Sequence, residues 1–235
     1  MDWILLTIFA ATFQTLRTAV QKTLKTKLST HAITFTRFGF GFPFAVLYLS
    51  CVLYFFNYSL PAINLKFISF CLLGSIFQIW GTSALVSAFS YKNFAVSSTY
   101  AKTEALLAAV LGVIFFKDYL SWSGFGIICI GMSGVVLISL GKKTLDWRGS
   151  ELFQKGPILG LASGLFFALT SLSIRHASLS LDSGNFLIQA AFTLVVMVSI
   201  QMLILVVYLG LYERDQFVYL KTSWKGSTIV GLTAI

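Results

Sequence analysis

The chain has 235 residues, of which 57% are apolar and only 11% charged, and its mean hydropathy is +0.86. A soluble domain carries about 25% charged residues, so this composition excludes an ordinary water-soluble protein. The net charge of +9 raises the question of nucleic acid, but Lys and Arg lie mostly singly or in pairs between apolar stretches. That placement favours membrane lipids over nucleic acid as the partner of the loops.

Seven apolar stretches of about twenty residues, followed by an eighth that begins at Gly226, occupy nearly all of the chain. At a rise of 1.5 Å per residue, each of the seven is long enough to cross a bilayer core of about 30 Å as a helix. We therefore predict an all-α, multi-pass membrane protein. The predicted complete spans are Trp3–Thr23, His31–Phe56, Phe67–Ser90, Phe94–Phe116, Trp122–Leu140, Pro157–His176 and Gly184–Leu211.

A polar linker separates five spans from the remaining three. When Val20 is aligned with Ile174, Ala10 falls on Gly164, and both segments show an apolar run followed by a polar patch. A unit with an odd number of spans must be inverted when it repeats, and inverted repeats are typical of secondary transporters. The predicted domains are a first repeat at 1–141, a linker at 142–156, and a second repeat at 157–235 that stops within its eighth span.

Metal and cofactor sites are not expected. Cys51, Cys71 and Cys129 all lie within predicted spans, where they serve as small packing residues. His31 and His176 lie at the ends of spans, far apart in the sequence, and suit the membrane interface better than a metal site.

Four charged side chains lie at membrane depth within predicted spans, away from the span ends: Arg17, Arg37, Lys102 and Glu104. Charges at this depth face the bundle interior or water, because exposure to lipid costs several kcal/mol. Glu104 is the deepest, and two interpretations are open: an ion-pair partner of Arg17 or Arg37, or a carboxylate that couples transport to protons. On a continuous helix Lys102 and Glu104 would lie about 200° apart and could not share one face.

Three positive side chains against one negative favour an anionic or zwitterionic substrate. Lys102 is also placed to extend to the interface, and Arg37 to lie near the headgroups, which would reduce that surplus. Further candidates for a cavity lining are Gln78, Trp80, Tyr100 and Thr103, although packing or anchoring at the interface explains each of them as well.

Several short motifs occur in a recognisable order: Trp3-Ile-Leu-Leu with Lys22, Thr34–Phe38, Ala84 with Ala88, Ala95–Tyr100, Gly112–Asp118, and Gly124, Gly131 and Gly134. In order and spacing the chain resembles the EamA branch of the drug/metabolite transporter superfamily. The resemblance implies ten spans in two inverted five-helix repeats and the movement of small metabolites by alternating access. Two departures are Lys102-Thr-Glu-Ala105, where many members have Pro, and the early end of the second repeat, which predicts a truncated form.

The family resemblance and the distribution of Lys and Arg predict opposite orientations in the membrane. The resemblance implies a cytoplasmic N-terminus, but the loops on the N-terminal side of the membrane hold only about three Lys and Arg, against about eleven on the opposite side. The positive-inside rule thus points to an external N-terminus. An interfacial end of the first span that holds Lys22, Lys25 and Lys27 would instead favour the cytoplasmic N-terminus of the family.

The predicted function is secondary transport of a small, amino-acid-like metabolite, with export as the direction, across a bacterial inner membrane. The alternatives are a membrane-embedded enzyme and a structural helical bundle. An enzyme is disfavoured because the sequence has no His-Glu-x-x-His or Gly-x-Ser-x-Gly motif.

Overall fold

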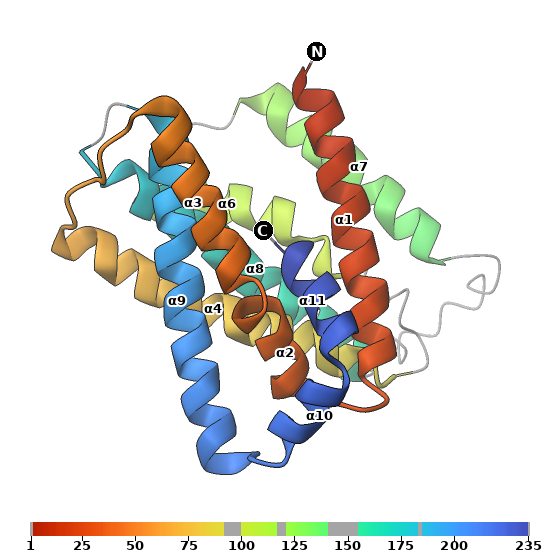
Figure 1. The fold of residues 1–235 in the computed structure, drawn as a ribbon. Helices are drawn as coiled ribbons and strands as arrows, with labels where there is room; N and C mark the ends of the chain where they lie inside the picture. The colour runs from red at the N-terminus through yellow and green to blue at the C-terminus, as the bar shows by residue number, and fades with distance from the viewer. Residues whose placement is uncertain (1, 92–99, 117–120, 141–154, 183–184, 235) are drawn as a thin grey trace. The chain divides into compact units, whose positions relative to one another are not determined.

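The computed structural model describes residues 2–91, 100–116, 121–140, 155–182 and 185–234 (Figure 1). All regular secondary structure in these ranges is helical, which confirms the predicted all-α class. The helices are α1 (Asp2–Leu24), α2 (Thr30–Gly39), α3 (Phe42–Phe56), α4 (Leu65–Ala88), α6 (Glu104–Phe116), α7 (Trp122–Leu140), α8 (Lys155–Leu179), α9 (Phe186–Tyr212), α10 (Gln216–Thr222) and α11 (Trp224–Leu232).

Four helical segments of the described residues are long and apolar enough to cross a membrane. They are Thr30–Phe56, Leu65–Ala88, Lys155–Leu179 and Phe186–Tyr212. They correspond to the second, third, sixth and seventh predicted spans, with ends that differ by a few residues. Two shorter apolar helices, Glu104–Phe115 and Trp122–Gly131, lie within the fourth and fifth.

The chain forms two compact units, and each is described by itself. The first combines Met1–Ser75 with His176–Ile235, and the second is Ile76–Arg175. The boundaries fall inside α4 and α8, so each of these helices contributes to both units. The division of the sequence into two repeats remains a prediction.

In the first unit α9 packs along α3 and α2 (Figure 1). An apolar cluster on α9 joins Phe192 to Phe67 of α4 and to Leu181, just beyond α8, and the rings of Phe67 and Phe192 stack with centroids 5.7 Å apart. A second cluster joins Val52 of α3 to Ile188 of α9. Inside a bilayer these contacts stabilise the unit through close packing, because lipid tails are as apolar as the side chains they replace.

The predicted span His31–Phe56 is interrupted. α2 ends at Gly39 and α3 begins at Phe42, with Pro43 in its first turn. Proline lacks the N–H group of an interior helical residue, and its ring clashes with the carbonyl four residues earlier, which here belongs to Gly39. The backbone of α11 approaches this break closely, since a Cβ atom added to Gly231 would lie 2.4 Å from the carbonyl carbon of Phe40.

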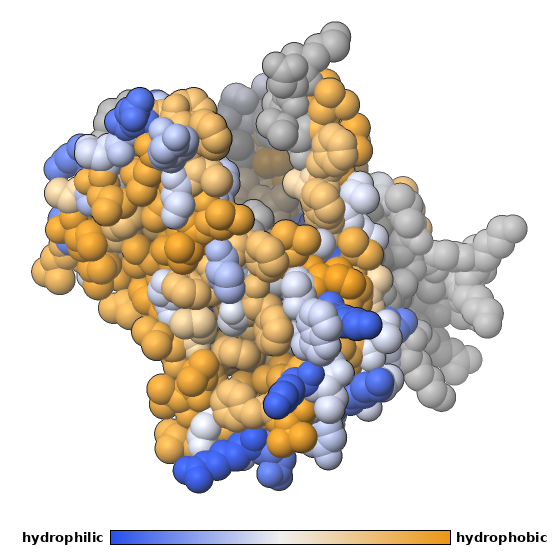
Figure 2. Space-filling model, in the orientation of Figure 1, coloured by the Kyte–Doolittle hydropathy of each residue, from blue (hydrophilic) through white to orange (hydrophobic). Residues whose placement is uncertain are grey.

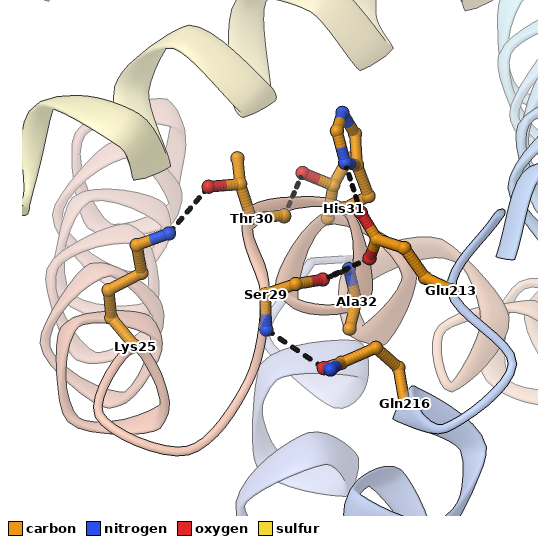
Figure 3. Close-up of polar contacts among 8 residues, drawn as sticks. Lys25, Ser29, Thr30, His31, Ala32, Glu213 and Gln216 are labelled. Carbon is orange, nitrogen blue, oxygen red and sulfur yellow. Dashed lines mark hydrogen bonds and ion pairs between the residues drawn. The ribbon is translucent and has the colours of Figure 1, made fainter.

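A group of polar contacts, here called the clasp, joins the start of α2 to the end of α9 (Figure 3). Glu213 accepts hydrogen bonds from the hydroxyl group of Ser29 through Oε2 and from Nδ1 of His31 through Oε1, the latter at 3.0 Å. Gln216 accepts the backbone N–H of Ser29 at 2.9 Å. A carboxylate at this position also interacts favourably with the positive end of the α2 dipole. The clasp fixes where α2 begins.

The second unit is built around α8. Ser163 donates a hydrogen bond of 2.9 Å to the backbone carbonyl of Gly81 in α4. A Cβ atom at Gly81 would lie 3.0 Å from the ring of Phe167, so the two helices approach closely at this glycine. α6 packs against α7, and the segment that precedes α6 contacts α8. The candidate site lies where the segment that precedes α6 contacts α8.

Candidate functional site

The fourth predicted span is broken at the residues that carry its charges. Tyr100 and Ala101 are helical, Lys102 and Thr103 form a turn, and α6 begins at Glu104. Both the backbone N–H and the hydroxyl group of Thr103 donate to the carbonyl of Tyr100, at 3.1 and 2.7 Å. These bonds occupy the carbonyl that a continuous α-helix would pair with the N–H of Glu104.

The break changes the predicted arrangement of the charges. Because Lys102 lies in the turn and Glu104 in the first turn of α6, the expected 200° separation on one continuous helix is wrong. The carbonyl of Thr103 accepts the first α6 bond, from the N–H of Leu107 at 2.9 Å. Glu104 therefore stands at the positive end of the α6 dipole, where a carboxylate is favoured.

Gly164 of α8 allows the broken segment to approach. A Cβ atom at this position would lie 2.6 Å from Oγ1 of Thr103 and 3.2 Å from the carbonyl oxygens of Tyr100 and Ala101. Two of these three atoms belong to the backbone, which cannot move aside as a flexible side chain can. A residue without a side chain is therefore required here.

About two turns further along α8, Ser171 contacts Glu104. Its hydroxyl group donates a hydrogen bond of 2.9 Å to Oε1 of the carboxylate. Gly164 and Ser171 are seven residues apart, close to two full turns, so they lie on the same face of α8. This face of α8 therefore contacts the turn at Gly164 and the carboxylate of Glu104 at Ser171.

An aromatic group lies on the neighbouring part of the second unit. The ring of Trp80 meets that of Phe166 edge-on at a centroid distance of 5.5 Å, and the ring of Phe77 stacks near Phe166 at 6.4 Å. Trp80 is 52% exposed, so about half of its surface is accessible to lipid or to a ligand. Gln78, on the same helix, is half-buried.

Two predicted site residues belong to the first unit. Nη1 of Arg17 in α1 donates a hydrogen bond of 3.4 Å to the carbonyl of Thr233, at the end of α11. The guanidinium group of Arg37, in the last turn of α2, lies 5.3 Å from the centroid of the Phe38 ring.

The structure thus brings Tyr100, Thr103 and Glu104 together against α8, and it exposes Lys102 in the turn beside them. Gly164 and Ser171 were not among the predicted site residues. The signal available was their seven-residue spacing, which places a small residue and a hydroxyl on one helical face within the sixth span.

A separate apolar cavity of about 260 Å³ lies between α6 and α7, lined by Val110, Val113, Ile114, Trp122 and Phe125. None of the predicted site residues lines it. Its wall includes Trp122, which is 91% exposed, so the cavity opens on the surface of the helix pair. None of the side chains that line it is charged, and we do not assign it to the site.

Comparison with known proteins agrees with the helical membrane architecture. A search of curated proteins found no significant match. The family model described as the EamA-like transporter family matches residues 1–140, more than half of the chain. This family consists of helical, multi-pass membrane transporters of the drug/metabolite type. The chain therefore belongs to the EamA-like transporter family of the drug/metabolite transporter superfamily.

Proposed function

We propose that this transporter moves a small, amino-acid-like metabolite that is anionic or zwitterionic, by alternating access coupled to protons. We further propose export as the direction and a bacterial inner membrane as the location. Membership in a transporter family supports transport as the whole activity, without an enzymatic step.

The observation that carries this proposal is the break in front of Glu104. Broken spans recur in secondary transporters because the interrupted backbone and the helix ends create polar positions within the bilayer. Here the interruption places a carboxylate at a helix start and gives it a hydroxyl partner, Ser171. A carboxylate at membrane depth, held by a neutral partner, is suited to exchange a proton during the transport cycle.

The substrate class is supported by the surplus of positive side chains within the spans. Arg17 and Arg37 are the two that remain charged under all physiological conditions. Arg17 contacts a backbone carbonyl in the described part of the chain. Since guanidinium groups bind carboxylates through two parallel hydrogen bonds, an amino-acid-like carboxylate is the substrate group that suits them best.

The decisive experiment is transport by the purified protein in sealed vesicles. A panel of radiolabelled amino acids and small organic acids would be presented with and without a pH gradient, and a protonophore would be added in a parallel sample. We expect accumulation of one substrate class that depends on the gradient and is lost with the protonophore. Accumulation that is the same with and without the pH gradient would reject proton coupling. Transport confined to cationic compounds would reject an anionic or zwitterionic substrate.

A further inference from the structure

The two ends of α9 differ sharply in charge. At 27 residues, α9 is about 40 Å long and can cross the bilayer. At its start, Asn185 donates a hydrogen bond to the hydroxyl group of Tyr58, just beyond α3. The connecting segments at this end, 57–64 and 180–182, contain one charged residue, Asp182, and Lys66 follows in the first turn of α4. We call this the neutral end of the first unit.

The opposite end carries a group of basic side chains. They come from the end of α1, the loop after it, and the region around α10. Six basic residues accompany two acidic ones, Glu213 and Asp215, which leaves a net charge of +4. We call this the basic end. Its basic residues are Lys22, Lys25, Lys27, Arg214, Lys221 and Lys225, all exposed except the half-buried Lys25.

Much of the negative charge at the basic end is already engaged. The carboxylate of Glu213 receives the clasp hydrogen bonds from Ser29 and His31. Nζ of Lys25 donates to Oγ1 of Thr30 beside it. Burial lowers the pKa of Lys25, and the nearby charge of Glu213 partly opposes this shift. The five exposed basic side chains therefore face outward with Asp215 as the one exposed carboxylate among them.

Large apolar side chains surround these charges. Val218 of α10 is 66% exposed, Tyr219 50%, and Trp224 at the start of α11 55%. Nζ of Lys225 lies 5.9 Å from the centroid of the Trp224 ring. In Figure 2 hydrophilic side chains gather at the lower end of α9 and over α10, below an apolar surface. Aromatic rings next to Lys and Arg are typical of the headgroup region of a bilayer.

We propose that the basic end binds the headgroups of anionic phospholipids, and that it consequently lies at the cytoplasmic face with the start of α1 outside the cell. Anionic lipids attract basic segments next to spans, and short loops rich in Lys and Arg stay on the cytoplasmic side. The alternative explanation for Lys25 and Lys27 was an interfacial extension of the first span. α1 ends at Leu24, so both belong to the loop and count fully toward orientation.

Lipid is a better occupant than a nucleic acid or a soluble anion. The exposed charges are interleaved with Val218, Tyr219 and Trp224, and such apolar surface is covered favourably by the acyl region of a membrane. The orientation inferred here opposes the cytoplasmic N-terminus that the family resemblance implies. The inferred orientation does not depend on the proposed transport cycle, so an experiment that rejects one of these proposals leaves the other standing.

Lipid binding is testable on the purified protein. It would be reconstituted into nanodiscs that contain phosphatidylcholine with or without about 30% phosphatidylglycerol, and bound lipid would be counted by native mass spectrometry. We expect retained phosphatidylglycerol to fall at least about tenfold in a variant with Lys27→Gln, Lys221→Gln and Lys225→Gln, because each surface charge near an anionic membrane contributes severalfold. Lys66→Gln, at the neutral end, serves as the control. Equal retention of both lipids, or an equal loss in the control, would overturn the proposal.

Orientation is testable in intact bacteria with a membrane-impermeant maleimide. Thr26→Cys reports the basic end and Ser59→Cys the neutral end, and both positions are exposed. The unsubstituted protein, with its native cysteines, gives the background. We expect Ser59→Cys to react from outside and Thr26→Cys to react only after the membrane is permeabilised. The reverse pattern, or labelling of both sites from outside, would contradict the inferred orientation.

Discussion

Ser171 donates a hydrogen bond of 2.9 Å to Glu104, a residue 67 positions earlier in the chain. The bond connects α8 to the first residue of α6, directly after the turn at Lys102 and Thr103. Its partner is a neutral hydroxyl group, so the carboxylate can release and take up a proton without breaking an ion pair with that partner. This relationship makes Glu104 the first residue to test.

Glu104→Gln is expected to lose proton-driven accumulation while it keeps exchange of substrate across the membrane. The amide resembles a protonated carboxyl group in shape but cannot release a proton. Glu104→Asp should retain proton-driven transport at a lower rate, because the shorter side chain moves the carboxylate away from Ser171. Accumulation and counterflow would be measured side by side in vesicles.

Proton-driven accumulation that is unchanged in Glu104→Gln would eliminate the coupling role. The ion-pair interpretation makes a different prediction. Glu104→Gln would then lower thermal stability, and a second change, Arg17→Gln or Arg37→Gln, would restore it. Melting temperatures of the single and double variants separate the two interpretations.

The hydroxyl group of Ser171 has a role that can be tested by itself. Ser171→Ala removes the donor to Glu104 but keeps a small residue on α8. We expect reduced proton-driven transport at near-normal expression, and a loss of stability of about 1 kcal/mol, the usual contribution of one hydrogen bond. Ser173→Ala is a suitable control, because that hydroxyl group donates to the carbonyl of Leu169 within its own helix. If both variants transport equally well, Ser171 does not support the site.

Four of the seven predicted spans match helices that are long and apolar enough to cross a membrane, since a run of about twenty apolar residues satisfies its backbone in a bilayer by forming a helix. The interruption between α2 and α3 also had a visible cause in Pro43, which a count of apolar residues overlooks. The break before Glu104 had no such signal. It depends on Thr103 bonding to the carbonyl of Tyr100 and on the approach of Gly164, 61 positions beyond Thr103.

The candidate site, too, could be predicted only in part from the sequence. Glu104 was evident from the cost of a charge at membrane depth. Ser171 was not, because a serine in an apolar helix most often bonds to its own backbone, as Ser173 does here. Only the fold shows which serine of α8 faces a carboxylate from another helix.

Gly164→Ala tests the close approach of α8 to the broken segment. The added Cβ atom would lie 2.6 Å from Oγ1 of Thr103 and near two backbone carbonyls. We expect a loss of about 1–3 kcal/mol from this overpacking, together with a loss of transport, because the turn must shift. Gly131→Ala is the matched control, since no described atom lies within 4 Å of its added Cβ. It should be neutral or slightly stabilising, because Ala favours a helix over Gly.

Thermal unfolding of both glycine variants in detergent measures this difference directly. The comparison is informative because Gly164 and Gly131 both lie in apolar helices of the second unit. A Gly164→Ala variant that is as stable and as active as Gly131→Ala would mean that the segment around Thr103 can move aside without cost.

Arg17 is the residue through which the proposed substrate class can be tested. Arg17→Lys keeps the charge but loses the planar group that holds a carboxylate by two bonds, so transport should weaken with the apparent affinity. Arg17→Gln removes the charge and should nearly abolish transport while expression persists. In both variants the hydrogen bond to the carbonyl of Thr233 is altered, so melting temperatures must be measured as well. Normal transport by both variants would exclude Arg17 as a substrate ligand. A fall in melting temperature with no change in apparent affinity would assign Arg17 to holding α1 against α11.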